Sequence, residues 1–210
     1  MKKSFVLFLL AGFMLQSCMT YYANYNVGLS SVESPEVAKK QIGEVKIENY
    51  KVKKTAMCSF EDDFIDVHWQ VTATTFDFRL KNKSGKLIKI NWDDASYVDI
   101  KGNVGRVMHN GVRYIVRNES QPMITIPKGT TLSDLLLPTN NVYFKVEDKA
   151  GSFKSSWKTQ RLIPSAYKSL DAYYTNVDKY IGSRMMILLP IIVDDTQYYY
   201  TFVFEVKELS

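Results

Sequence analysis

The carboxyl groups best suited to acid and base chemistry in this chain lie in two short runs, Glu61-Asp62-Asp63 and Asp93-Asp94. Two carboxyl groups on either side of a glycosidic bond can protonate the leaving oxygen and activate water, as in a glycan hydrolase. Alternatively, both runs lie in turns, because aspartate accepts hydrogen bonds from turn backbone and charged groups prefer water. We favour the turn interpretation and predict a protein that is not an enzyme and has no catalytic residues.

The two histidines do not belong to a metal-binding motif. His68 and His109 lie far apart in the chain, without an H-E-x-x-H sequence or a cysteine pair to complete a site. The acidic runs lack the ligand spacing of a calcium-binding EF-hand, and the chain has neither a G-x-S-x-G elbow nor a P-loop. We predict no metal site and no cofactor.

Positive charge and aromatic rings are concentrated in residues 149–180, where six basic residues stand against two acidic ones. Cations beside rings suit an anionic partner such as lipid headgroups or a wall glycan. The predicted contact residues for such a partner are Lys154, Trp157, Lys158 and Arg161. The alternative is that the rings close one end of the fold while the lysines are merely solvated.

The first 17 residues have the organisation of a secretory signal peptide. Lys2 and Lys3 give a positive start, an apolar run follows over residues 5–15, and small or polar residues come next. A membrane-spanning helix needs about 20 apolar residues, and this run is clearly shorter. We predict a cleaved signal and not a transmembrane helix.

The end of this signal, Leu15-Gln16-Ser17-Cys18, resembles the lipobox of bacterial lipoproteins, with Gln16 a departure from the commonest pattern. The resemblance implies that the Cys18 thiol carries diacylglycerol and that the new amino terminus is acylated. The alternative is cleavage by another peptidase, which leaves a free thiol. No aspartate lies next to Cys18, and no acidic residue occurs before Glu33. By the same resemblance, this predicts an outer-membrane anchor facing the periplasm.

Composition predicts a folded domain beyond the signal. Hydrophobic residues make up 46% of the chain and aromatic residues 13%, and this hydrophobic content is well above that of a disordered chain. If Cys18 carries lipid, Cys58 has no partner in the chain, so the fold does not depend on a disulfide. The formal charge of +5 falls to +3 when Lys2 and Lys3 leave with the signal, which does not indicate nucleic-acid binding.

Alternating apolar and polar residues dominate the chain after about residue 43 and predict strands. Over residues 76–81 every second residue is apolar, and residues 88–92 repeat the pattern. Residues 82–85 between them predict a turn, so we expect a β-hairpin. We place Trp69 and Trp92 in the core. Val203 breaks the alternation of the last strand, so we expect that strand to be partly covered on both sides. Residues 165–180 predict a short helix, because their apolar residues recur at spacings of three and four.

Residues 76–107 also resemble the immunoglobulin-like domains of envelope lipoproteins and of the late-embryogenesis-abundant-like group. An apolar strand, an Asn-x-Ser turn, a second strand, an acidic and aromatic stretch and a glycine carry this resemblance. It implies a binding or structural module without catalytic residues. Many short strands separated by turns predict an all-β protein, an immunoglobulin-like antiparallel β-sandwich with a short helical insertion. We expect a signal over residues 1–17, a lipidated cysteine and tether over 18–42, and one domain over 43–210 with an insertion at about 148–180.

Overall fold

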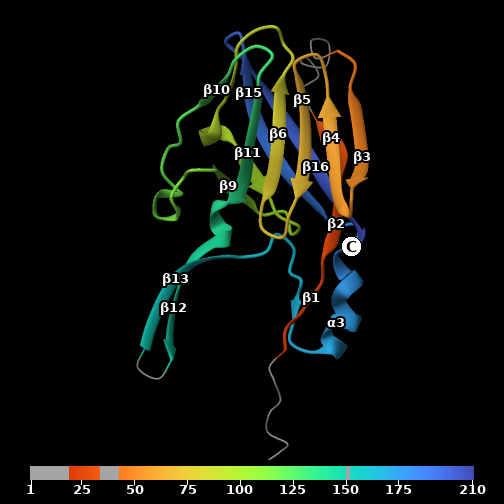
Figure 1. Ribbon diagram of the computed structural model, residues 1–210, viewed down its shortest axis with the longest axis vertical. Coiled ribbons are helices and arrows are strands. Elements are labelled where there is room, and N and C mark those ends of the chain that lie inside the picture. Colours follow the sequence, from red (N-terminus) through yellow and green to blue (C-terminus); the bar gives the residue numbers. More distant parts are fainter. Residues whose placement is uncertain (1–18, 34–42, 150–151) are drawn as a thin grey trace, which may run out of the picture.

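The structure is a computed structural model that describes residues 19–33, 43–149 and 152–210, and most of its regular structure is β-strand (Figure 1). The strands are β1 (Tyr21–Tyr22), β2 (Tyr25–Glu33), β3 (Lys46–Val52), β4 (Thr55–Glu61), β5 (Ile65–Val71), β6 (Phe76–Asn82), β7 (Ile88–Ile90), β8 (Ser96–Val98), β9 (Val104–His109), β10 (Ile124–Ile126), β11 (Thr131–Pro138), β12 (Val142–Lys149), β13 (Ser152–Thr159), β14 (Ala166–Tyr167), β15 (Arg184–Val193) and β16 (Thr196–Leu209). The helices within these ranges are α3 (Leu170–Asn176) and the 3-10 helices η2 (Trp92–Asp94), η3 (Tyr114–Val116), η4 (Thr139–Asn141) and η5 (Val177–Tyr180). The predicted mostly-β fold with a short helix is confirmed.

Twelve of these strands form one antiparallel sheet that curls into a nearly closed barrel. In one wall, β3, β4, β5, β6 and β11 lie side by side in that order. In the other wall, β15 pairs with β16 along one edge and with β8 and β7 along the opposite edge. Strand β9 pairs with both β8 and β11 and so joins the two walls.

The predicted sandwich is therefore wrong, and the main sheet is a nearly closed barrel. In both architectures one face of every strand is buried, so the alternation of side chains is the same. What separates them is whether the outer strands of the two sheets hydrogen-bond to each other. Here residues Val107–His109 of β9 pair with Leu136–Pro138 of β11, and a strand-edge pairing of this kind leaves no periodic signal in the sequence.

A side-chain amide bridges the walls on the opposite side of the barrel. Asn49 in β3 accepts a hydrogen bond from the backbone N–H of Leu29 in β2 at 2.7 Å and donates to the Leu29 carbonyl at 2.9 Å. This amide thus contacts both backbone groups of Leu29, as a neighbouring strand would. Gly28 makes the approach possible, because a Cβ there would lie 2.5 Å from the Asn49 Oδ1 atom.

We expect Asn49→Ala to lower the free energy of unfolding by about 1–2 kcal/mol, because two backbone groups of Leu29 lose their partner. Urea titration of the wild type and the variant measures this loss. Asn110→Ala is the matched control, since Asn110 is exposed in a turn and its replacement is expected to cost about 0.5 kcal/mol or less. Equal losses in the two variants would contradict a role for Asn49 in closing the barrel.

Aromatic side chains from both walls fill the barrel interior. The Trp69 ring of β5 lies 5.1 Å from Phe78 of its own wall and 5.0 Å from Phe202 of the opposite wall. Trp92 is also buried, so the predicted core positions of both tryptophans are confirmed. Val203 is buried between neighbours that face the interior, as expected from the break in alternation. Cys58 is a free, buried cysteine.

The hairpin predicted over residues 76–92 does not form. Strand β6 pairs with β5 and β11, whereas β7 pairs with β10 and β15 in the other wall. Asn82 is fully buried between them and donates its amide to the carbonyls of Lys86 at 2.7 Å and Ile126 at 2.9 Å. These hydrogen bonds stabilise the segment in which the chain crosses from one wall to the other. The predicted turn after β6 therefore forms, but it does not join two paired strands.

The chain enters the fold much earlier than the predicted tether over residues 18–42 implies. Strand β1 pairs with β14, and β2 extends the main sheet beside β16. Residues 34–42 and Cys18 lie outside the described residues, as does the predicted signal peptide. The sequence does not indicate β2 as a strand, because its glycine, two serines and asparagine have low strand propensity, and β2 is held mainly by pairing and packing.

Candidate functional site

Strands β12 and β13 form a two-stranded hairpin that projects below the barrel in Figure 1, and we call this hairpin the arm. The two strands pair with each other over their full length, from Val142 opposite Thr159 to Lys149 opposite Ser152. Because side chains alternate across a strand, the arm has two faces of different character. It overlaps the insertion predicted at about residues 148–180, but β12 begins six residues before that range.

One face of the arm is apolar and largely uncovered. Phe144, Val146 and Phe153 on this face are 52%, 60% and 75% exposed. Trp157 lies opposite Phe144 and is half-buried, with its ring 5.3 Å from that of Phe144. Two-stranded hairpins are marginal on their own, so a hairpin that exposes three large apolar side chains indicates a contact surface.

Trp157 fastens the base of the arm to the barrel. Its ring lies 6.0 Å from Tyr114, and the Arg117 guanidinium lies 5.3 Å from the ring centroid. This contact belongs to a small cluster around Met108, Leu137 and Val142. Trp157, which we predicted as a partner contact, therefore packs against the barrel.

The other face of the arm carries the charged groups. Lys154 lies opposite Glu147 and Lys158 lies opposite Tyr143, and both lysines are exposed. Lys145 is paired with Glu147 at 2.7 Å, and its hydrogen bond to this carboxylate raises the Lys145 pKa. Lys154 and Lys158 thus share a face, but Trp157 points to the opposite face of the same strand.

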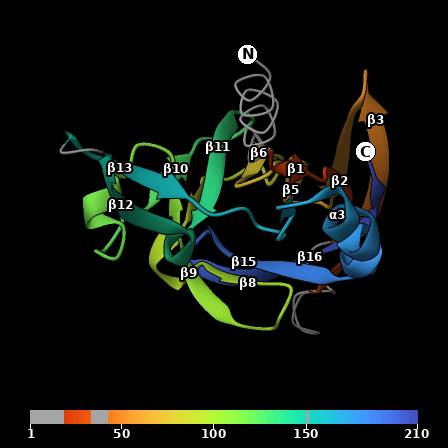
Figure 2. The same ribbon diagram turned by 90° about the horizontal axis from the view of Figure 1, so that it is seen from below.

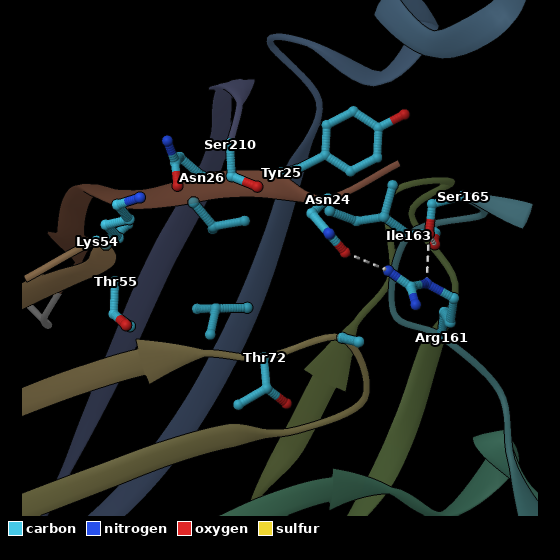
Figure 3. Close-up of a pocket in the computed structure, with 14 residues that line it drawn as sticks. Asn24, Tyr25, Asn26, Lys54, Thr55, Thr72, Arg161, Ile163, Ser165 and Ser210 are labelled. Atoms are coloured by element: carbon cyan, nitrogen blue, oxygen red, sulfur yellow. Dashed lines mark hydrogen bonds between the residues drawn. The ribbon is translucent and has the colours of Figure 1, made fainter. Parts of the chain in front are cut away.

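Arg161 does not belong to this surface. Its guanidinium donates to the Ser165 hydroxyl and to the Asn24 side-chain oxygen at 3.3 Å (Figure 3). The same guanidinium donates to the Ala23 carbonyl at 3.0 Å. It also lies 5.5 Å from the centroid of the Tyr22 ring. Arg161 therefore ties Ala23 and Asn24 to the loop after the arm. Of the four predicted contact residues, only Lys154 and Lys158 share a face of the arm.

Arg161 also lines a small cavity of about 210 Å³ at the same end of the barrel (Figure 3). Its other polar walls come from the β3–β4 and β5–β6 turns, from residues 24–26 and from Ser210, which follows β16. Lys54, Thr55, Thr72 and Ser165 are among the lining residues. The Arg161 guanidinium is already hydrogen-bonded to other residues of the chain. We therefore interpret this cavity as a place where several segments of the fold meet.

A larger groove of about 550 Å³ runs over the outer face of β3 to β6. In it the Tyr50 hydroxyl lies 2.7 Å from His68 Nδ1, and His68 Nε2 lies 3.1 Å from Asp66 Oδ1. Burial and the nearby Cys58 and Asp66 raise the pKa of Tyr50, so its phenol is protonated at neutral pH and is a poor nucleophile. This hydrogen-bonded chain orients His68 on the outer surface.

His109 has a different environment. Its Nδ1 atom lies 3.2 Å from Asp134 Oδ2, and its ring is stacked on Trp92 at 4.7 Å between centroids. The ring packs against the core. Within residues 19–33, 43–149 and 152–210, no group of three or more His, Cys, Asp or Glu side chains could hold a metal ion.

Asp62 of the first acidic run accepts hydrogen bonds from turn backbone, as we expected for a turn residue. The expected exposure is wrong for Asp62, which is buried. Its Oδ1 atom accepts from the N–H groups of Phe64 at 2.8 Å and Ile65 at 2.7 Å, and its Oδ2 atom accepts from the Tyr200 hydroxyl at 2.8 Å. Burial raises the pKa of Asp62. A carboxyl group that is 1% exposed and bonded in this way has no access to a glycan substrate.

The second acidic run also has partners in its own part of the fold. Asp93 accepts from Arg106 at 3.0 Å and from the N–H of Gln121 at 3.0 Å, and it is hydrogen-bonded to Ser120. These hydrogen bonds lower the Asp93 pKa, with Ser120 the largest cause. Asp93 therefore fixes η2 to the loop before β10.

Comparison with known proteins gave no further assignment: no family model, no curated protein and no solved structure matches this chain. No helix of the described residues is both long enough and apolar enough to cross a membrane. The candidate functional surface therefore rests on the geometry of the arm.

Proposed function

We propose that this protein is a bacterial envelope lipoprotein, anchored through lipid on Cys18, which acts as a non-enzymatic binding module. The arm is its contact surface, and its partner is an anionic component of the envelope. The observation that carries this proposal is a projecting hairpin with three exposed apolar side chains on one face and Lys154 and Lys158 on the other. Exposed apolar side chains of this size mark contact sites.

The cellular location follows from the lipobox resemblance. The proposed anchor lies in the outer membrane and the domain faces the periplasm, because no aspartate lies next to Cys18 to favour the inner membrane. In this compartment, anionic lipid headgroups and wall glycans are the candidate partners of the lysine face. No cofactor takes part in this function.

We expect Lys154→Gln combined with Lys158→Gln to weaken binding of a chain starting at Met19 to anionic vesicles by about 2 kcal/mol, or roughly thirtyfold. Such a chain keeps every described strand and helix. Binding of the wild type is also expected to fall when salt shortens the Debye length from about 10 to about 3 Å. Arg161 stays unchanged in this test, because its replacement would break contacts within the fold.

Cosedimentation with vesicles and with wall fragments measures this binding. The control is Lys101→Gln combined with Lys128→Gln, which removes the same charge from two exposed positions outside the arm. The control is expected to bind within about twofold of the wild type, because only charges close to the membrane contribute. If both double variants bind equally well, the arm lysines are not the contact.

A further inference from the structure

The distance from the proposed lipid anchor to the fold is short. Strand β1 begins at Tyr21 and pairs with β14, and the Ala23 N–H donates to the Ser165 carbonyl at 2.9 Å. Only Met19 and Thr20 separate Cys18 from β1. Three residue steps span at most about 10 Å. A lipid on Cys18 would therefore hold the barrel against the bilayer, and no long tether intervenes.

The end of the barrel at this attachment point also carries the arm and α3. Strand β1, the arm and α3 all lie below the barrel in Figure 1. Seen from below, the arm and α3 lie on opposite sides with β1 between them (Figure 2). Strand β6 runs away from this end, and the turn containing Lys128 lies beyond the far end of β6, where the Gly129 N–H donates to the Asn82 carbonyl at 3.1 Å. We call the end with β1 the anchor end.

Exposed apolar side chains occur on each element of the anchor end. Tyr22 in β1 and Leu170 in α3 are exposed, and Tyr174 in α3 is 70% exposed. Together with Phe153 of the arm, they lie on three separate elements. A flat, extended apolar boundary can contact all three at once, whereas a small protein partner requires one contiguous patch. Single exposed apolar side chains elsewhere, such as Val104, are ordinary.

Charge at the anchor end is compatible with an anionic surface. Lys154 and Lys158 are exposed on the arm, and Lys168 and Lys179 are exposed beside α3. Long lysine side chains can place their ammonium groups among headgroups while neighbouring rings enter the apolar boundary. The acidic side chains in these segments are Glu147 and Asp148 on the arm and Asp171 and Asp178 near α3, and they would stay at headgroup level.

We infer that the partner of the arm is the anchoring bilayer itself, and that the protein lies with its anchor end on the membrane. Phe153 of the arm and Tyr174 of α3 enter the interface at the same time, on either side of the lipid attachment point. This inference rests on the proposed lipid anchor at Cys18. It identifies a lipid surface as the anionic partner and fixes the orientation of the barrel.

Depth-dependent fluorescence in the full, lipidated chain tests this orientation. The chain is reconstituted into vesicles of phosphatidylethanolamine and phosphatidylglycerol after labelling Phe153→Cys, Tyr174→Cys or Lys128→Cys with an environment-sensitive dye. All three positions are exposed, and the native Cys58 is buried, so the wild type controls for unwanted labelling. Probes at 153 and 174 are expected to shift to the blue and to be quenched about twofold or more by lipids with a nitroxide near the headgroup. The probe at 128 is expected to change in neither way.

Each contrary result has a distinct meaning. If the protein stays with the vesicles but the probes at 153 and 174 are not quenched, membrane docking is wrong and the anchor stands. If the blue shift occurs without quenching by lipid and grows with protein density, the arm binds a second copy of the chain, which also overturns the inference. If the protein does not stay with the vesicles, the proposed anchor fails, and the docking inference fails with it.

Discussion

Asp62→Ala is expected to lower the free energy of unfolding by about 3 kcal/mol, because the change leaves three donors, two of them buried, without an acceptor. The donors are the N–H groups of Phe64 and Ile65 and the hydroxyl of Tyr200. Since Asp62 is 1% exposed, water has little access to replace the lost carboxyl group. Urea unfolding followed by tryptophan fluorescence measures the loss.

Asp62→Asn is the matched control, because its side-chain oxygen can still accept from the two N–H groups, and its loss is expected to be smaller than that of Asp62→Ala. Burial raises the Asp62 pKa in the folded state. A carboxyl group whose folded-state pKa is raised favours folding most below its ordinary pKa, and this contribution is lost as the pH rises through the raised value. The stability of the wild type relative to Asp62→Asn is therefore expected to fall between acidic and neutral buffer. A relative stability that rises with pH over this interval would contradict a buried, raised carboxyl group.

Replacing Cys18 with alanine is expected to move the mature protein from the membrane pellet to the soluble fraction. Several acyl chains hold a protein firmly, at about 0.8 kcal/mol for each buried methylene, whereas the arm alone gives weak and salt-sensitive binding. The variant is best exported with a signal that another peptidase removes, because an uncleaved apolar run over residues 5–15 would itself bind membrane.

Fractionation in high salt with immunoblotting compares this variant with the wild type. Cys58→Ala is the matched control, since it removes the other cysteine of the chain and is expected to remain in the pellet. If the processed Cys18→Ala chain sediments in high salt as completely as the wild type, the protein is held by something other than lipid on Cys18.

The sequence predicted strands well where each strand has one buried face. In β6 the buried residues Phe76, Phe78 and Leu80 alternate with more exposed ones, as the apolar pattern indicated. Barrel closure was beyond prediction, because it depends on pairing between β9 and β11 and on one amide, Asn49, that reaches Leu29. Neither feature changes the local alternation from which strands are inferred.

The structure shows where the predicted contact residues lie, and the sequence indicates only part of that arrangement. Charge placed Lys154 and Lys158 on an exposed surface, but composition could not reveal that Trp157 points to the opposite face. The alternation of Phe153, Ser155 and Trp157 against Lys154, Ser156 and Lys158 carries that information, and it would have identified β13 as a strand. Composition also could not reveal that Arg161 bonds within the fold, because its partners Ala23 and Asn24 are far away in sequence. The burial of Asp62 was likewise beyond prediction, because its partner Tyr200 lies in the last strand, far away in sequence.

The mass of the amino-terminal peptide of the mature protein tests the proposed anchor most directly. Protein extracted from membranes with detergent is digested, and its first peptide is identified by mass spectrometry. We predict a peptide that begins at Cys18 and carries a thioether-linked diacylglyceryl group together with an acyl chain on its amino group. A first peptide that begins at another residue, or that begins at Cys18 with a free thiol, would contradict the lipid anchor and the membrane-docked orientation inferred from it.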